Sequence, residues 1–159
     1  MPQFFPTQFM LDFDHLHDRE VDHVIGAFFL VRQELFKTLH GFDERFFVYL
    51  EDMDFSLRSA QQGWRTWYMA AAQAFHKGGG VSEQVRAHRL FYSLRSRLLY
   101  SFKHFARRQA FLITGLTLSI EFVARLGHAI LQRSPTAIWD TLRGYGMLWA
   151  DIPRLIRER

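Results

Sequence analysis

Three acidic residues stand close together where the sequence changes from a loop pattern to a helical one. They are Glu51, Asp52 and Asp54, and they follow an aromatic stretch that contains Phe46, Phe47 and Tyr49. Aromatic rings pack against the apolar faces of sugars, and carboxylates accept hydrogen bonds from sugar hydroxyls. A carboxylate at a helix start is also a suitable base for a hydroxyl proton. A simpler role stays open, because such carboxylates commonly cap the free N–H groups of a helix.

A histidine and a second acidic pair are the other candidates for metal or phosphate chemistry. His76 precedes Lys77 and three consecutive glycines, and an imidazole there can ligate a metal or contact a phosphate. A solvated loop histidine is the alternative. Asp12 and Asp14 have the Asp-x-Asp spacing of a metal-binding pair, but no buried strand leads into them. We therefore expect no metal site at that pair.

Composition limits the possible classes of protein. The chain has 159 residues, of which 48% are hydrophobic and 17 are Phe, so it can bury one compact core. It has no Cys, which excludes disulfides, thiolate nucleophiles and Cys-ligated metals. The first residues lack the basic and apolar regions of a signal peptide, so we expect no secretory signal.

The elements that must position the acidic cluster alternate between strand and helix patterns. Residues 24–31 form a short apolar run that is typical of a strand buried on both faces. Helical spacing follows over residues 32–40 and 52–62, and Gly41 and Gly63 can supply the left-handed residues that end these helices. Residues 65–69 again have strand composition. This order predicts an α/β arrangement.

The second half of the chain is helical and basic. Up to Glu83 there are seven Lys and Arg against twelve Asp and Glu, and from Gln84 onward there are thirteen against four. No acidic residue lies between Glu83 and Glu121, while seven cations do: Arg86, Arg89, Arg95, Arg97, Lys103, Arg107 and Arg108. Such a run favours an anionic partner. Nucleic acid is possible in principle, but the apolar segment that follows favours a membrane surface.

Three helices are expected in this half, starting near Ser82, over residues 110–120 and over residues 136–156. The apolar run 110–120 is interrupted by Glu121 and Arg125 before it reaches the ~20 residues that a bilayer crossing needs. We therefore predict an interfacial or partly buried helix rather than a membrane span.

Several short motifs of this sequence resemble those of a known family and occur in the same order. Residues 26–32, 41–47, 51–58 and 63–64, together with His76, resemble the C-terminal half of family 2 glycosyltransferases, particularly the rhamnosyltransferase-like members that build bacterial surface polysaccharides. The similarity covers about Glu20 to Lys103. It implies the C-terminal part of a GT-A fold, a nucleotide-diphosphate sugar donor, a divalent metal (Mg or Mn) and inversion at the anomeric carbon.

The resemblance also implies roles for individual residues. Asp52 resembles the general base of the family, with Glu51 as its acidic neighbour near the acceptor and Asp54 in support. Gly26 and Ala27 are similar to the segment that lines the donor sugar site.

Two more residues would act on the diphosphate of the donor. His76 resembles a histidine that helps to hold the metal and diphosphate. Arg97 is a cation that could stabilise the departing diphosphate, and we include it among the substrate-binding candidates.

The resemblance leads to a division of the chain. Residues 1–82 are expected to form the acceptor-side part of the catalytic domain, and residues 83–159 a basic helical region that docks on the cytoplasmic face of the inner membrane. The family's nucleotide-binding units and their Asp-x-Asp motif have no counterpart here, so we expect the chain alone to bind nucleotide sugar weakly.

The expected acceptor is lipid-linked or a polysaccharide, and we expect no nucleic-acid partner. A rival hypothesis is a non-catalytic, membrane-associated interaction module in which the acidic cluster only caps a helix.

Overall fold

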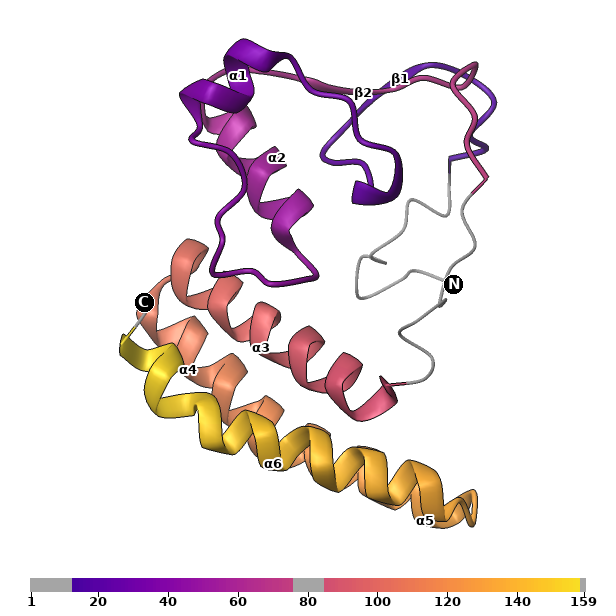
Figure 1. Ribbon diagram of the computed structural model, residues 1–159, viewed down its shortest axis with the longest axis vertical. Coiled ribbons are helices and arrows are strands. Elements are labelled where there is room, and N and C mark those ends of the chain that lie inside the picture. Colours follow the sequence, from indigo (N-terminus) through magenta and orange to yellow (C-terminus); the bar gives the residue numbers. More distant parts are fainter. Residues whose placement is uncertain (1–12, 76–84, 158–159) are drawn as a thin grey trace.

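The computed structural model describes residues 13–75 and 85–157, which form an N-terminal part and a group of long helices (Figure 1). The N-terminal part contains β1 (Arg19–Val21), the short 3-10 helix η1 (Gly26–Phe28), α1 (Gln33–Thr38), α2 (Glu51–Gln61) and β2 (Thr66–Tyr68). The helices that follow are α3 (Arg86–His104), α4 (Arg107–Leu116), the π-helix η3 (Thr117–Glu121), α5 (Phe122–Leu131) and α6 (Pro135–Arg157). The described residues are therefore mostly helical.

The two strands pair antiparallel, with Val21 opposite Thr66 and Arg19 opposite Tyr68. β2 confirms the strand expected over residues 65–69. No strand was expected at β1, because three residues are too few to show a period. Its strand form depends on pairing with β2, which is distant in the sequence.

The buried strand expected over residues 24–31 is wrong for this structure. The segment contains the turn η1 instead, and the side chain of Leu30 is 94% exposed. Among the described residues no strand lies beside it, so its backbone has no ladder of hydrogen bonds to join. An apolar composition alone did not distinguish a buried strand from an exposed apolar loop.

The two short helices of the N-terminal part follow the sequence prediction. Gly41 has φ of +72° and Gly63 has φ of +80°, as the left-handed residues expected after α1 and α2. The N–H of Gly41 donates to the carbonyl of Phe36 at 2.8 Å, which closes the end of α1.

A cluster of four phenylalanines fixes the N-terminal part around α2. Phe55 of α2 lies at its centre, with ring centroids 5.8 Å from Phe29, 5.7 Å from Phe36 and 5.3 Å from Phe42. Phe55 is 1% exposed. Edge and stacked contacts of this kind add to the gain from burial itself. The cluster holds the segment that carries Gly26 against α2.

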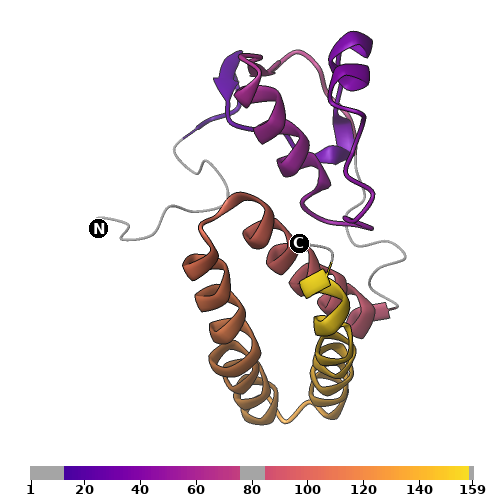
Figure 2. The ribbon, with the colours of Figure 1, turned by 90° about the vertical axis from the view of Figure 1, so that its left-hand side faces the viewer.

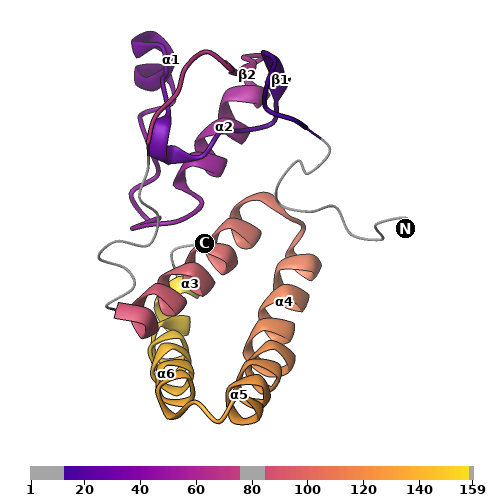
Figure 3. The same cartoon turned by 90° about the vertical axis from the view of Figure 1, so that its right-hand side faces the viewer.

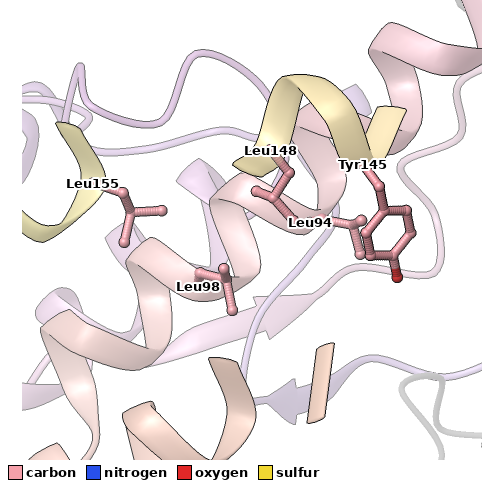
Figure 4. Close-up of a cluster of buried hydrophobic side chains, with 5 residues drawn as sticks. All are labelled: Leu94, Leu98, Tyr145, Leu148 and Leu155. Atoms are coloured by element: carbon pink, nitrogen blue, oxygen red, sulfur yellow. The ribbon is translucent and has the colours of Figure 1, made fainter. Parts of the chain in front are cut away.

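The largest buried core lies between α3 and α6. Leu94 and Leu98 of α3 face Tyr145, Leu148 and Leu155 of α6 (Figure 4). A Cβ added at Gly144 would lie 3.0 Å from the carbonyl of Ala87, so glycine permits the close approach of the two helices there. This core confirms the helix expected over residues 136–156.

The segment from α4 through η3 to α5 is one helix, Arg107–Leu131, of 25 residues. It leaves the end of α3, runs away from the N-terminal part and turns back into α6 (Figures 2 and 3). Its most apolar window has a mean hydropathy of 1.5 and is 11% buried in the protein. By length and composition alone this helix could cross a membrane.

The expectation that the apolar helix stops at Ile120 is therefore corrected. Arg125 binds Glu121 at 2.8 Å, and Arg97 binds Glu121 from the other side. The two charges that interrupt the apolar run neutralise one another within the helix, so the backbone continues without a break.

Candidate active site

Asp52 lies in the first turn of α2 and is half-buried. Its Oδ2 accepts a hydrogen bond from the N–H of Gly26 at 2.7 Å, and its Oδ1 accepts one from the N–H of Met53 at 2.8 Å. Two backbone donors on separate oxygens fix the orientation of the carboxylate. Each oxygen has a further lone pair, so the group can still accept a hydroxyl proton.

The capping role accounts for part of this arrangement. The N–H of Met53 is one of the free groups at the start of α2, and Asp52 satisfies it. The second bond reaches back 26 residues to Gly26, which helix capping does not require. The N-cap residue itself is Leu50, whose side chain makes no capping bond.

The backbone just before Asp52 adopts an uncommon conformation. Tyr49 and Leu50 have φ of 69° and 66°, a left-handed region that bulky residues rarely occupy. The loop is held from α3, where Ser96 Oγ donates to the carbonyl of Val48 at 2.7 Å. Such conformations persist where the surrounding structure enforces them, and they cluster at functional sites.

Glu51 is the acidic neighbour of Asp52 and is partly enclosed. Its Oε2 is buried and has no hydrogen-bond partner among the described residues. Burial raises the pKa of Glu51, and the adjacent charge of Asp52 raises it further. Glu51 therefore keeps its proton to a higher pH than an ordinary glutamate does.

Asp54 is the centre of a buried ion-pair cluster rather than an open binding group. It is 0% exposed, and its carboxylate binds Arg58 at 2.8 Å, Lys103 at 2.6 Å and His104 at 2.7 Å. Burial acts to raise the pKa of Asp54, but these three partners together hold it below its ordinary value. Asp54 can therefore support the site only by joining α2 to α3. Its carboxylate is enclosed and is not accessible to a substrate.

The loop that leads to Asp52 is anchored to α3 by further charges. Lys103 binds Asp43 at 2.7 Å, and Arg45 binds the same carboxylate at 2.6 Å. The hydrogen bonds from Arg45 and Lys103 hold the pKa of Asp43 far below its usual range. Arg95 donates to the carbonyl of Arg45 at 2.8 Å and binds Asp151 of α6 at 2.7 Å. The loop is thus tied to both long helices.

These contacts change the interpretation of the basic run in α3. Arg95, Arg97 and Lys103 each bind an acidic group of the protein, so they are not a free surface for an anionic partner. Sequence analysis missed them as anchors, although the acidic first half and the basic second half carry opposite charge. That complementarity was the signal that the two halves bind one another.

The other predicted site residues lie in different places. Gly26 lies against Asp52, and Ala27 follows it in η1. Arg97 does not extend to α2, because its guanidinium binds Thr117 at 2.9 Å and Glu121 in η3. The structure therefore brings Gly26 to Asp52 and places Arg97 in the helical part.

The described residues do not supply a metal site. Within 13–75 and 85–157, no group of three or more His, Asp or Glu lies close enough to hold an ion. His76 lies outside the described residues, as does Asp12. Asp14 accepts the N–H of Leu16 at 3.0 Å in an exposed turn.

Comparison with known proteins adds a family match over most of the chain. Residues 8–153 match the family described as glycosyl transferase family group 2. Rhamnosyltransferase WbbL of Escherichia coli (strain K12) is 35% identical over 94 residues, which are 58% of this chain and 33% of that protein. The N-acetylglucosaminyl-diphospho-decaprenol L-rhamnosyltransferase of Mycobacterium tuberculosis (strain CDC 1551 / Oshkosh) is 39% identical over 59 residues.

The second match covers 37% of this chain and 19% of the mycobacterial protein. The chain thus spans at most about a third of the length of these curated relatives. No solved structure matches the chain.

Proposed function

The chain belongs to glycosyl transferase family group 2, and we propose that it forms the acceptor side of an inverting glycosyltransferase in which Asp52 is the general base. One observation carries the assignment of the base. The carboxylate of Asp52 is held by two backbone N–H groups from different segments and remains half-buried at the end of a strained loop. A base must be oriented by its surroundings and still reach a substrate proton.

The proposed reaction is a single displacement. The acceptor oxygen attacks C1 of the donor sugar, the bond from C1 to the diphosphate oxygen breaks with inversion, and the hydroxyl proton passes to Asp52. The donor is a nucleotide-diphosphate sugar, with rhamnose suggested by the names of both relatives. The acceptor is a sugar on a lipid diphosphate or a growing polysaccharide, and the whole enzyme has a GT-A fold.

A divalent metal belongs to this proposal through the family resemblance alone. His76 is its candidate ligand in this chain, and further ligands would have to come from outside the described residues. When bound, the metal neutralises charge on the departing diphosphate. Arg97 is not assigned to that task, because Glu121 already binds its guanidinium.

Replacing Asp52 by Asn in the complete protein tests the base. The amide has the shape of the carboxylate but cannot take the proton, so we expect transfer to fall at least a hundredfold with the fold retained. The control is Asp14→Asn, which makes the same chemical change in an exposed turn. Turnover of Asp52→Asn within a few fold of the control would refute the assignment.

We also propose that the exposed apolar helix docks the protein on the cytoplasmic face of a membrane. Three of its side chains, Leu112, Ile120 and Val123, are 62–66% exposed. An amphipathic helix of this kind buries its apolar face at the headgroup boundary, and Arg107 and Arg108 at its start can contact anionic lipid. The apolar helix turns back into α6, which packs along α3 and α5 and carries the charged residues Asp140 and Arg143. Because these charges favour contact with water, we expect the apolar helix to lie in the plane of the membrane surface.

Vesicle flotation tests this docking. Leu112→Lys with Ile120→Lys should abolish flotation with anionic and neutral vesicles, whereas Leu30→Lys, at a still more exposed leucine outside the helix, should not. Retained flotation of the double variant would refute docking through this helix. Flotation of the wild-type protein without any transfer by the complete protein would favour the rival, a non-catalytic membrane module.

A further inference from the structure

A cleft lies beside α2, and Asp52 is not among the residues that line it. It has a volume of about 360 Å³, within the range of small-molecule sites. Its walls come from four places in the fold: the end of β1 with Asp22 and His23, the face of α2 with Met53 and Leu57, the turn at Trp64, and Tyr100 of α3.

Three polar groups of this cleft have no hydrogen-bond partner among the described residues. Among the described residues, the carboxylate of Asp22, the ring of His23 and the hydroxyl of Tyr100 make no hydrogen bond, while Glu20 and Arg65 at the rim bind one another at 3.3 Å. Polar groups around a cavity normally pair within the protein or with a ligand or water. These three groups offer both donors and acceptors to a ligand with several hydroxyls.

The rest of the wall is aromatic and aliphatic. Trp64 is 40% exposed and lines the cleft together with the apolar side chains of α2. A flat aromatic face together with a carboxylate and an imidazole suits a pyranose ring, which has apolar C–H faces and a belt of hydroxyls.

Two of the segments that form the walls of the cleft also hold the carboxylate of Asp52. Met53, which lines the cleft, is the next residue after Asp52 and donates its N–H to that carboxylate at 2.8 Å. The segment with His23 continues within three residues to Gly26, whose N–H binds the other oxygen of Asp52 at 2.7 Å. The segments that hold the carboxylate of Asp52 are therefore the ones that border the cleft.

We propose that this cleft binds the terminal sugar of the acceptor and presents its hydroxyl to Asp52. Trp64 supplies the stacking face, and Asp22, His23 and Tyr100 bind the hydroxyls that do not react. The inference rests on the proposed function, since it assigns the acceptor of that same reaction.

Acceptor kinetics of the complete protein test the cleft. The probe is a short-chain N-acetylglucosaminyl diphospholipid, with nucleotide-diphospho-rhamnose as the donor. Trp64→Ala should raise the KM for the acceptor about tenfold and leave the KM for the donor unchanged. Tyr100→Phe, which removes one hydroxyl, should raise it about threefold. Trp67→Ala is the matched control, because Trp67 is 56% exposed on β2 and does not line the cleft.

A direct binding measurement separates the cleft from the proposed reaction. Saturation-transfer NMR with methyl glycosides of N-acetylglucosamine, galactose and rhamnose should detect binding to the wild-type protein and to Asp52→Asn, and not to Trp64→Ala. If Trp64→Ala leaves the KM for the acceptor unchanged while Asp52→Asn is inactive, the cleft does not bind the acceptor sugar. The assignment of Asp52 as the base then remains intact. If Asp52→Asn stays active, the base assignment fails, and the NMR result alone decides whether the cleft binds a sugar. Absence of binding by the wild-type protein would overturn it.

Discussion

Replacing Asp54 by Asn should destabilise the fold far more than replacing Asp52 by Asn. Asp54 is fully buried and binds three side chains at 2.6–2.8 Å, whereas Asp52 is half-buried and binds two backbone N–H groups. Asparagine keeps the shape of either side chain, so neither change opens a cavity. What changes is the charge that opposes the cations around Asp54.

The magnitude follows from what each cation loses. Removing one partner of a buried ion pair costs about 3–5 kcal/mol, because the other charge stays buried without compensation. Here Lys103 keeps Asp43 at 2.7 Å, and Arg58 keeps the carbonyls of Leu39 at 2.7 Å and Gly41 at 2.9 Å. We therefore expect the lower end, about 3 kcal/mol for Asp54→Asn, against roughly 1 kcal/mol for Asp52→Asn.

Urea unfolding monitored by circular dichroism measures both values, and an unchanged m-value would show that the two variants unfold from the same native state. The pH dependence gives a second check. Because the pKa of Asp54 is lowered in the folded state from 3.8, its contribution is fully present above that value and is lost as the pH falls through the lower, folded pKa. The difference between wild type and Asp54→Asn should thus be constant above a pH of about 5 and shrink in acid. A destabilisation below about 1 kcal/mol at neutral pH would refute the reasoning.

Three further changes test single contacts. Gly26→Ala places a Cβ 3.3 Å from Oδ2 of Asp52, so transfer should fall roughly tenfold in an activity assay while stability changes by less than about 1 kcal/mol. Glu51→Gln should raise the melting temperature at pH 7 but not at pH 4, because a raised pKa means that stability is lost as the pH rises through it. Tyr145→Phe removes a buried hydroxyl without a partner in the described chain, and urea unfolding should show equal or up to about 1 kcal/mol greater stability.

The sequence predicted the elements that depend on local pattern. The helices around Leu35, Phe55 and Leu148 have apolar residues at helical spacing, and glycines with positive φ follow α1 and α2. It failed for residues 24–31, where a composition typical of strands occurs in a loop. Whether such a run becomes a strand depends on a neighbouring strand, which is information that the segment itself does not contain.

The sequence could nominate residues for the candidate site but could not predict their geometry. Acidic residues after an aromatic loop drew attention to Asp52 and Asp54, yet spacing could not show that one is oriented by Gly26 and the other is enclosed by Lys103 and His104. Both facts depend on contacts between residues 26 to 50 positions apart. The cleft at Trp64 was missed for the same reason, since its walls come from four separate segments.

The expected border between a catalytic part and a docking part, residues 1–82 and 83–159, does not separate the interactions that position Asp52. Ser96 holds the strained loop at Val48, Arg95 holds it at Arg45, and Lys103 binds Asp54 two residues after Asp52. α3 is packed in turn on α6, and it leads directly into the exposed apolar helix. A force that shifts α3 would therefore act on the loop before Asp52 through bonds of 2.6–2.8 Å, and not through a flexible linker. The proposed docking and the positioning of Asp52 would consequently share one helix.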